Sequence, residues 1–116
     1  MLHGDAVKDV AFTVDDARGL YNKAVSRGAK SIREPWEESD EHGTVIMASI
    51  GTYGDVVHTL VQRSGYKGVF LPGYLSPPVD PIVSLLPPTC LLFIDHVVGN
   101  QPDREMEAAC EMYLDR

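Results

Sequence analysis

The sequence predicts an α+β fold, with one helix followed by an antiparallel meander of strands. Between residues 7 and 63, a strand-like stretch precedes a segment with helical spacing, and three more strand-like stretches follow it. A proline-rich segment then leads to one further predicted strand and helix, between residues 89 and 116. The order β-α-β-β-β indicates a curved sheet with a helix on one face, succeeded by the start of a second module.

Four stretches of the first module have the composition of strands. They are rich in β-branched and apolar residues, and the first alternates apolar and polar side chains. We expect the second to be a short edge strand that Pro35 ends. An acidic hairpin turn over residues 37–43 and a turn over residues 51–55 separate the later strands. The predicted strands are residues 7–14, 30–35, 44–50 and 56–63.

The helix of the first module is predicted from the spacing of its apolar residues. Asp15 is the expected N-cap, because its carboxylate can accept hydrogen bonds from the first free amides of a helix. Gly28 is the expected stop, because glycine adopts the left-handed conformation that follows many helices. The apolar face would consist of Ala17, Leu20, Tyr21, Ala24 and Val25.

A connector is predicted after the first module. Prolines are frequent there and prevent a regular helix or a central strand. Its apolar and aromatic side chains indicate a segment packed on a domain surface, with Trp36, Tyr66, Phe70 and Tyr74 as anchors. The expected divisions are residues 1–65 for the βαβββ module, 66–88 for the connector and 89–116 for the start of a second domain.

The last part of the chain is predicted to form a strand over residues 91–98 and a helix over residues 104–116, with Asp103 as its N-cap. A strand and one helix cannot bury their apolar faces alone, so we expect the chain to be incomplete and to fold poorly by itself. The apolar side chains at helical spacing are Met106, Ala109, Cys110 and Tyr113, with Leu114 beside them.

A short internal repeat relates the two parts. Asp9 and Asp95 each lie inside a predicted strand that leads by a short turn to an aspartate-capped helix. His96 stands where the first copy has Val10. Asp95 is expected on the opposite face of its strand from His96, and so not to orient the imidazole ring.

Composition narrows the classes of function. The net charge of −7 and the absence of a basic run argue against a nucleic-acid surface. No apolar stretch approaches the roughly 20 residues of a membrane span, and the start of the chain has no apolar signal segment, so we expect a cytoplasmic protein. Cys90 and Cys110 are expected to be small buried hydrophobes in a reducing compartment.

The histidines leave alternatives open when only the residues are considered. His96, in a short apolar run, fits either a hydrogen-bonded strand histidine or one ligand of a metal site. His58 is expected to be a core or pocket histidine. His3 and His42 are expected to be solvated, and Asn100 and Gln101 could reach a substrate or simply form a turn.

Five stretches together resemble one enzyme family. They are HGDAVKDVAF, GAKSIREPWEE, TYGDVVHTLV, FLPGY and IDHVVGNQPD. In combination they resemble the animal-type 4-hydroxyphenylpyruvate dioxygenases, along almost the whole chain from His3. The resemblance implies the βαβββ modules of the vicinal oxygen chelate superfamily, which also contains glyoxalases. It also implies conversion of 4-hydroxyphenylpyruvate and O2 to homogentisate and CO2, in tyrosine and phenylalanine catabolism.

The resemblance further implies an Fe(II) centre held by two histidines and one glutamate. His96 falls on the first of these histidines, and the other two ligands are expected beyond Arg116. No other catalytic or cofactor-binding residue is expected within the chain. One histidine cannot hold Fe(II) in this geometry, so the chain alone should be inactive.

The full-length protein is expected to be a homodimer. Two alternatives stay open: a catalytically silent dimerisation or binding domain of the superfamily, and a relative of hydroxymandelate synthase, which shares the iron ligands.

Overall fold

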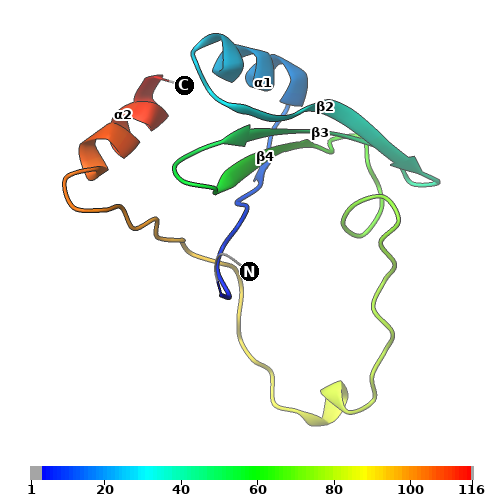
Figure 1. Cartoon of the computed structure of the whole chain (residues 1–116). Helices are drawn as coiled ribbons and strands as arrows, with labels where there is room; N and C mark the ends of the chain where they lie inside the picture. Colours follow the sequence, from blue (N-terminus) through cyan, green and yellow to red (C-terminus); the bar gives the residue numbers. More distant parts are fainter. Residues whose placement is uncertain (1–3, 116) are drawn as a thin grey trace.

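The computed structural model describes residues 4–115, and His3 lies outside them. Its main feature is a four-stranded sheet in the order β1-β4-β3-β2, with β1 parallel to β4 and the other neighbours antiparallel (Figure 1). The elements are β1 (Phe12–Thr13), α1 (Ala17–Ser26), β2 (Ser31–Asp40), β3 (Gly43–Gly51), β4 (Val57–Gln62), the 3-10 turn η1 (Val83–Leu85) and α2 (Met106–Asp115). The α+β class and the βαβββ order of the first module are confirmed.

Strand β1 is shorter than predicted, because a side chain interrupts its backbone ladder. The amide of Thr59 donates to a carboxylate oxygen of Asp9 at 3.1 Å, and the Thr59 hydroxyl donates to the other at 2.6 Å. Pairing with β4 is still continued on both sides, through the amides of Val10 and Val14. The predicted strand 7–14 therefore follows β4 as an extended chain, of which only Phe12 and Thr13 form a regular strand.

Helix α1 begins one residue later than predicted. Asp16, and not Asp15, is the N-cap, and its carboxylate accepts a hydrogen bond from the amide of Gly19 at 2.8 Å. Gly28 ends the helix as expected, with a φ of +91° that favours glycine. The amides of Gly28 and Ala29 donate back to carbonyls of the last turn, as in a Schellman motif.

Strand β2 continues through Pro35, so the prediction that proline ends it is wrong. The β2–β3 pairing shifts its register between Arg33 and Trp36, and this irregularity takes up the proline, whose missing amide is tolerated on an edge strand. The expected turn over residues 37–43 is therefore mostly strand, and the reversal occurs at Glu41 and His42. His42 is solvent-exposed, as expected.

The core has two parts, one on each face of the sheet, because successive residues of β3 point to opposite faces. On the face covered by α1, the buried residues are Ala17, Tyr21, Ala48 and Leu60. On the other face they are Val45, Met47, Val61 and Tyr66, with Trp36 and Leu71 partly buried against them. The second part contains connector residues, so the connector begins as part of the core.

The connector packs on the module only in its first part. Tyr66 is buried, and its hydroxyl donates to Asp40 at 2.8 Å. Gly73 donates its amide to the same carboxylate at 3.1 Å. Beyond this point the chain leaves the sheet in a wide loop (Figure 1). Phe70 and Tyr74 contact each other but are half-exposed, so the prediction that they are packing anchors is wrong. The same prediction is confirmed for Trp36 and Tyr66.

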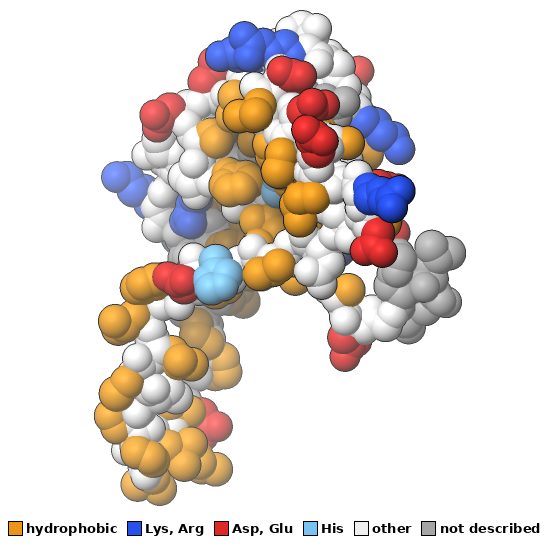
Figure 2. Space-filling model, turned by 90° about the vertical axis from the view of Figure 1, so that its left-hand side faces the viewer, with side chains coloured by type: hydrophobic (Ala, Val, Ile, Leu, Met, Phe, Trp, Pro, Cys, Tyr) orange, Lys and Arg blue, Asp and Glu red, His pale blue; other side chains and the backbone are white. Residues whose placement is uncertain are grey.

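The predicted strand over residues 91–98 is not formed. The segment is extended, and no strand among the described residues pairs with it. Its apolar side chains are largely exposed, as are those of the loop that projects at the bottom of Figure 2. An extended chain becomes a strand only when a neighbour satisfies its amides and carbonyls. Of the strand and the helix predicted for residues 89–116, only the helix α2 is therefore formed among the described residues.

Helix α2 begins at Met106, so Asp103 is not its N-cap. Arg104 has a φ of +70°, outside the helical region, and separates the aspartate from the helix. Cys90 and Cys110 are both exposed, which contradicts their predicted burial, because the strand and sheet that would have covered them are not formed. Among the described residues, no helix is long and apolar enough to cross a membrane.

Candidate functional site

His96 lies on the extended segment before α2, and its side chain is 73% exposed. Its Nδ1 lies 2.6 Å from Oδ2 of Asp95. The expectation that Asp95 points away from the ring is wrong, because strand alternation does not apply where no strand forms. The carboxylate holds the ring through Nδ1, so Nε2 is the nitrogen left for a metal ion.

The described residues do not bring other ligands to His96. No group of three or more histidine, cysteine, aspartate or glutamate side chains within residues 4–115 could hold a metal ion. His96 is also absent from the lining of the main cavity. The chemistry of the pair nevertheless fits a metal ligand, since metal-bound histidines commonly donate their second ring nitrogen to a carboxylate.

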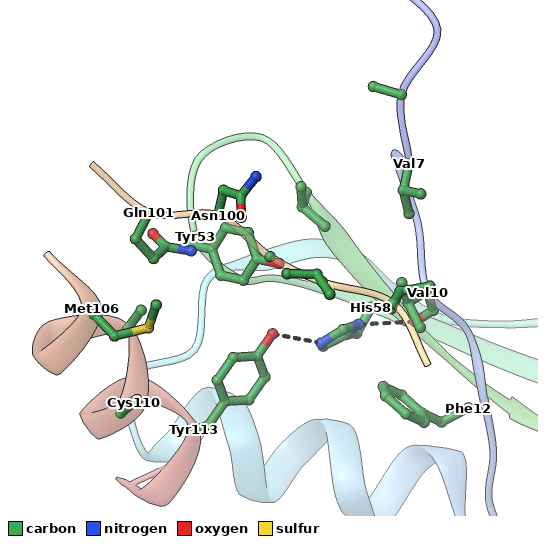
Figure 3. A pocket seen from close by; sticks show the side chains of 16 residues that line it. Val7, Val10, Phe12, Tyr53, His58, Asn100, Gln101, Met106, Cys110 and Tyr113 are labelled. Atoms are coloured by element: carbon green, nitrogen blue, oxygen red, sulfur yellow. Dashed lines mark hydrogen bonds between the residues drawn. The ribbon is translucent and has the colours of Figure 1, made fainter. Parts of the chain in front are cut away.

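The main cavity lies between the first module and α2 and has a volume of about 600 Å3. Figure 3 shows side chains from the N-terminal segment, β4, the 53–56 turn and α2 directed into it. No aspartate, glutamate, lysine or arginine is among its lining residues, which are mostly apolar. Its polar groups are those of Tyr53, His58, Asn100, Gln101 and Tyr113.

His58 connects two parts of the chain across this cavity. It lies on β4, and the prediction of a core or pocket histidine is confirmed. Nδ1 lies 2.9 Å from the carbonyl oxygen of Val10, and Nε2 lies 3.0 Å from the hydroxyl of Tyr113 (Figure 3). The ring of Phe12 packs edge-on against the imidazole at 4.8 Å between centroids.

These contacts fix the tautomer of neutral His58. A carbonyl oxygen only accepts, so Nδ1 carries the hydrogen and donates to Val10. Nε2 is then an acceptor, and the Tyr113 hydroxyl donates to it. Burial, together with the charge of nearby Tyr53, raises the pKa of Tyr113 above its ordinary 10.0, although a hydrogen bond with Thr52 opposes this. The hydroxyl therefore stays protonated at neutral pH and remains a donor.

The turn before α2 lies against Tyr53. A Cβ placed on Gly99 would collide with the Tyr53 hydroxyl, so the Tyr53 side chain would have to move to admit any other residue there. Asn100 and Gln101, which the sequence marked as possible substrate contacts, line the cavity beside it. The helical spacing of the sequence had placed Tyr113 on the apolar face of the last helix. No local pattern identifies Tyr53, which lies in a turn, as a residue that lines the cavity.

We compared the chain with known proteins. No family model matches it. A 4-hydroxyphenylpyruvate dioxygenase of Xenopus tropicalis is 56% identical over 113 residues, which are 96% of this chain and 29% of the relative. The enzyme of the same name from Danio rerio is 53% identical, over 96% of this chain and 28% of its own. That of Tetrahymena thermophila is 50% identical, over 97% of this chain and 28% of its own.

A solved structure of a mutant 4-hydroxymandelate synthase from Streptomyces coelicolor is 35% identical. The match covers 52% of this chain and 18% of the synthase chain, with a TM-score of 0.48. The chain spans less than a third of the length of the curated relatives named above. Over 113 of its residues, this chain is thus similar to one segment of the 4-hydroxyphenylpyruvate dioxygenases, as its motifs indicated.

Proposed function

We propose that this chain is a segment of an Fe(II)-dependent 4-hydroxyphenylpyruvate dioxygenase and that His96 is one of its iron ligands. The observation that carries the proposal is the 50–56% identity to dioxygenases of that name from a ciliate, a frog and a fish. The longer enzyme would convert 4-hydroxyphenylpyruvate and O2 to homogentisate and CO2. We also propose that it is a cytoplasmic homodimer, testable by fractionation and by size-exclusion chromatography with light scattering.

The Asp95–His96 pair supports the assignment of the ligand. Asp95 holds Nδ1 of the imidazole at 2.6 Å, which leaves Nε2 on the side of the ring away from the aspartate. Bound Fe(II) would provide the chemistry that involves O2. A site of two histidines and one carboxylate leaves positions open for substrate and O2. The role of this chain is to present one ligand. Since one imidazole binds Fe(II) weakly, the chain alone should be inactive.

A chimera tests the proposal. The matching segment of the Xenopus tropicalis enzyme is replaced by this chain, and the purified protein is assayed for homogentisate and for bound iron. We expect turnover with Fe(II), and at least about a hundredfold loss of iron affinity in His96→Ala, because a direct ligand is removed. His42→Ala is the matched control, since His42 is likewise exposed but lies in the β2–β3 turn.

Each other outcome has a definite meaning. A chimera that folds, as judged by its thermal melt, but does not act on 4-hydroxyphenylpyruvate would refute the proposed function. Formation of hydroxymandelate would replace it with the synthase activity. Full iron affinity in His96→Ala would refute the ligand assignment and leave the dioxygenase assignment standing.

A further inference from the structure

Two contacts join the C-terminal segment to the first module, one on each side of the cavity. Tyr113 of α2 donates to His58 of β4, and the backbone at Gly99 packs against Tyr53. The rings of Tyr53 and Tyr113 also contact each other edge-on, at 6.5 Å between centroids. The segment that follows His96 is therefore attached to the first module at Tyr113, near the C-terminal end of α2, and at Gly99, before the helix begins.

The His58 contact is directional. The imidazole is held at its far nitrogen by the Val10 carbonyl at 2.9 Å and at its side by the Phe12 ring. In this orientation Nε2 points at the Tyr113 hydroxyl, as Figure 3 shows. A side chain fixed by two partners of its own module can fix a third group with little loss of entropy. His58 is therefore suited to hold α2.

Helix α2 depends on such contacts. It has only ten residues, and a helix of this length is marginal in water when nothing packs against it. None of its residues is buried. Its contacts with the first module are made by Tyr113, through the hydroxyl bond to His58 and the ring contact with Tyr53. Loss of the His58 bond should therefore loosen the whole helix.

We propose that His58 is a positioning residue: through Tyr113 it docks α2 on the first module and so sets the place of the segment that carries His96. The docking of α2 by His58 does not depend on the proposed function, but the expected effect of His58 on iron binding rests on it. His58 itself does not contact the metal in this proposal. Its chemical contribution is the ring nitrogen Nε2, which accepts one hydrogen bond from the Tyr113 hydroxyl.

The first experiment needs no iron and uses the whole chain. Amide hydrogen exchange is measured for wild type, Tyr113→Phe, His58→Ala and the double variant. We expect exchange in α2 to rise about tenfold in Tyr113→Phe, the effect of one lost hydrogen bond, with β3 and β4 unchanged. The double variant should exchange no faster than His58→Ala, because both substitutions remove the same bond.

Tyr74→Phe is the matched control, because the Tyr74 ring packs on Phe70 in the connector. Its α2 amides should exchange as in wild type. Unchanged α2 exchange in Tyr113→Phe, or independent multiplying effects of the two substitutions, would overturn the docking role.

The second experiment introduces Tyr113→Phe and Tyr74→Phe into the chimera described above. We expect Fe(II) to bind about tenfold more weakly in the first and normally in the second, with His58→Gln partly preserving affinity because its amide can still reach Tyr113. An active chimera whose iron affinity is unaffected by Tyr113→Phe would refute positioning while the proposed function stands. An inactive parent chimera would refute the proposed function, and the exchange experiment would still decide the docking role.

Discussion

Replacement of Val45 by alanine is expected to lower the free energy of unfolding by about 2–3 kcal/mol. Val45 lies on β3 and is completely buried, between Met47, Val61 and the connector residue Tyr66. The substitution removes two methyl groups, each worth about 0.8 kcal/mol of transfer free energy. The cavity that remains adds a further cost, because strands on one side and the connector on the other cannot collapse into it.

The assay is urea unfolding followed by the fluorescence of Trp36, the only tryptophan, which packs on the same cluster. With a slope of about 1–1.5 kcal/mol/M, the midpoint should fall by about 2 M. Val79→Ala is the control, since Val79 lies in the connector and is 94% exposed. A loss below about 0.5 kcal/mol at Val45, within the usual range of surface substitutions, would refute the reasoning, as would equal losses at both valines.

Three further predictions follow from the local structure. Desolvation alone would raise the pKa of Asp40, but hydrogen bonds from Tyr66 and from the amides of His42 and Gly73 lower it below its ordinary 3.8. Its stabilisation is therefore complete above pH 3.8 and lost as the pH falls through the lowered pKa. Asp40→Asn should speed amide exchange at Tyr66 and Gly73 at pH 7, and this difference from wild type should shrink as the pH falls below 3.8. No difference at pH 7 would contradict this. Asp16→Ala should cost about 1 kcal/mol in urea unfolding, and Asp15→Ala almost nothing, since it caps no amide; the reverse order would show that the cap is misplaced. Both cysteines are exposed, so two thiols per chain should react with a thiol reagent in the folded protein, and protection of either would argue against the open arrangement of the C-terminal segment.

Local patterns were sufficient where an element is stabilised by its own residues. The helical spacing from Ala17 and the stop at Gly28 predicted α1 to within a residue or two, since capping and amphipathicity act within the helix. The apolar runs of β3 and β4 likewise predicted those strands closely. The expected stop at Pro35 was wrong, because whether a proline ends a strand depends on its being at a sheet edge with an irregular register.

The candidate site shows the same division. The sequence by itself determined the α+β class, the βαβββ order, the dioxygenase resemblance and the expectation that His96 is a ligand. Only the tertiary structure decided that Asp95 holds the His96 ring, that residues 91–98 have no partner strand, and that His58 meets Tyr113. For His58 and Tyr113 the physical reason is separation along the chain: they are 55 residues apart, and no local propensity encodes a hydrogen bond that only the docking of α2 creates. Asp95 and His96 are neighbours, but their contact depends on the absence of a partner strand, which would have set their side chains on opposite faces.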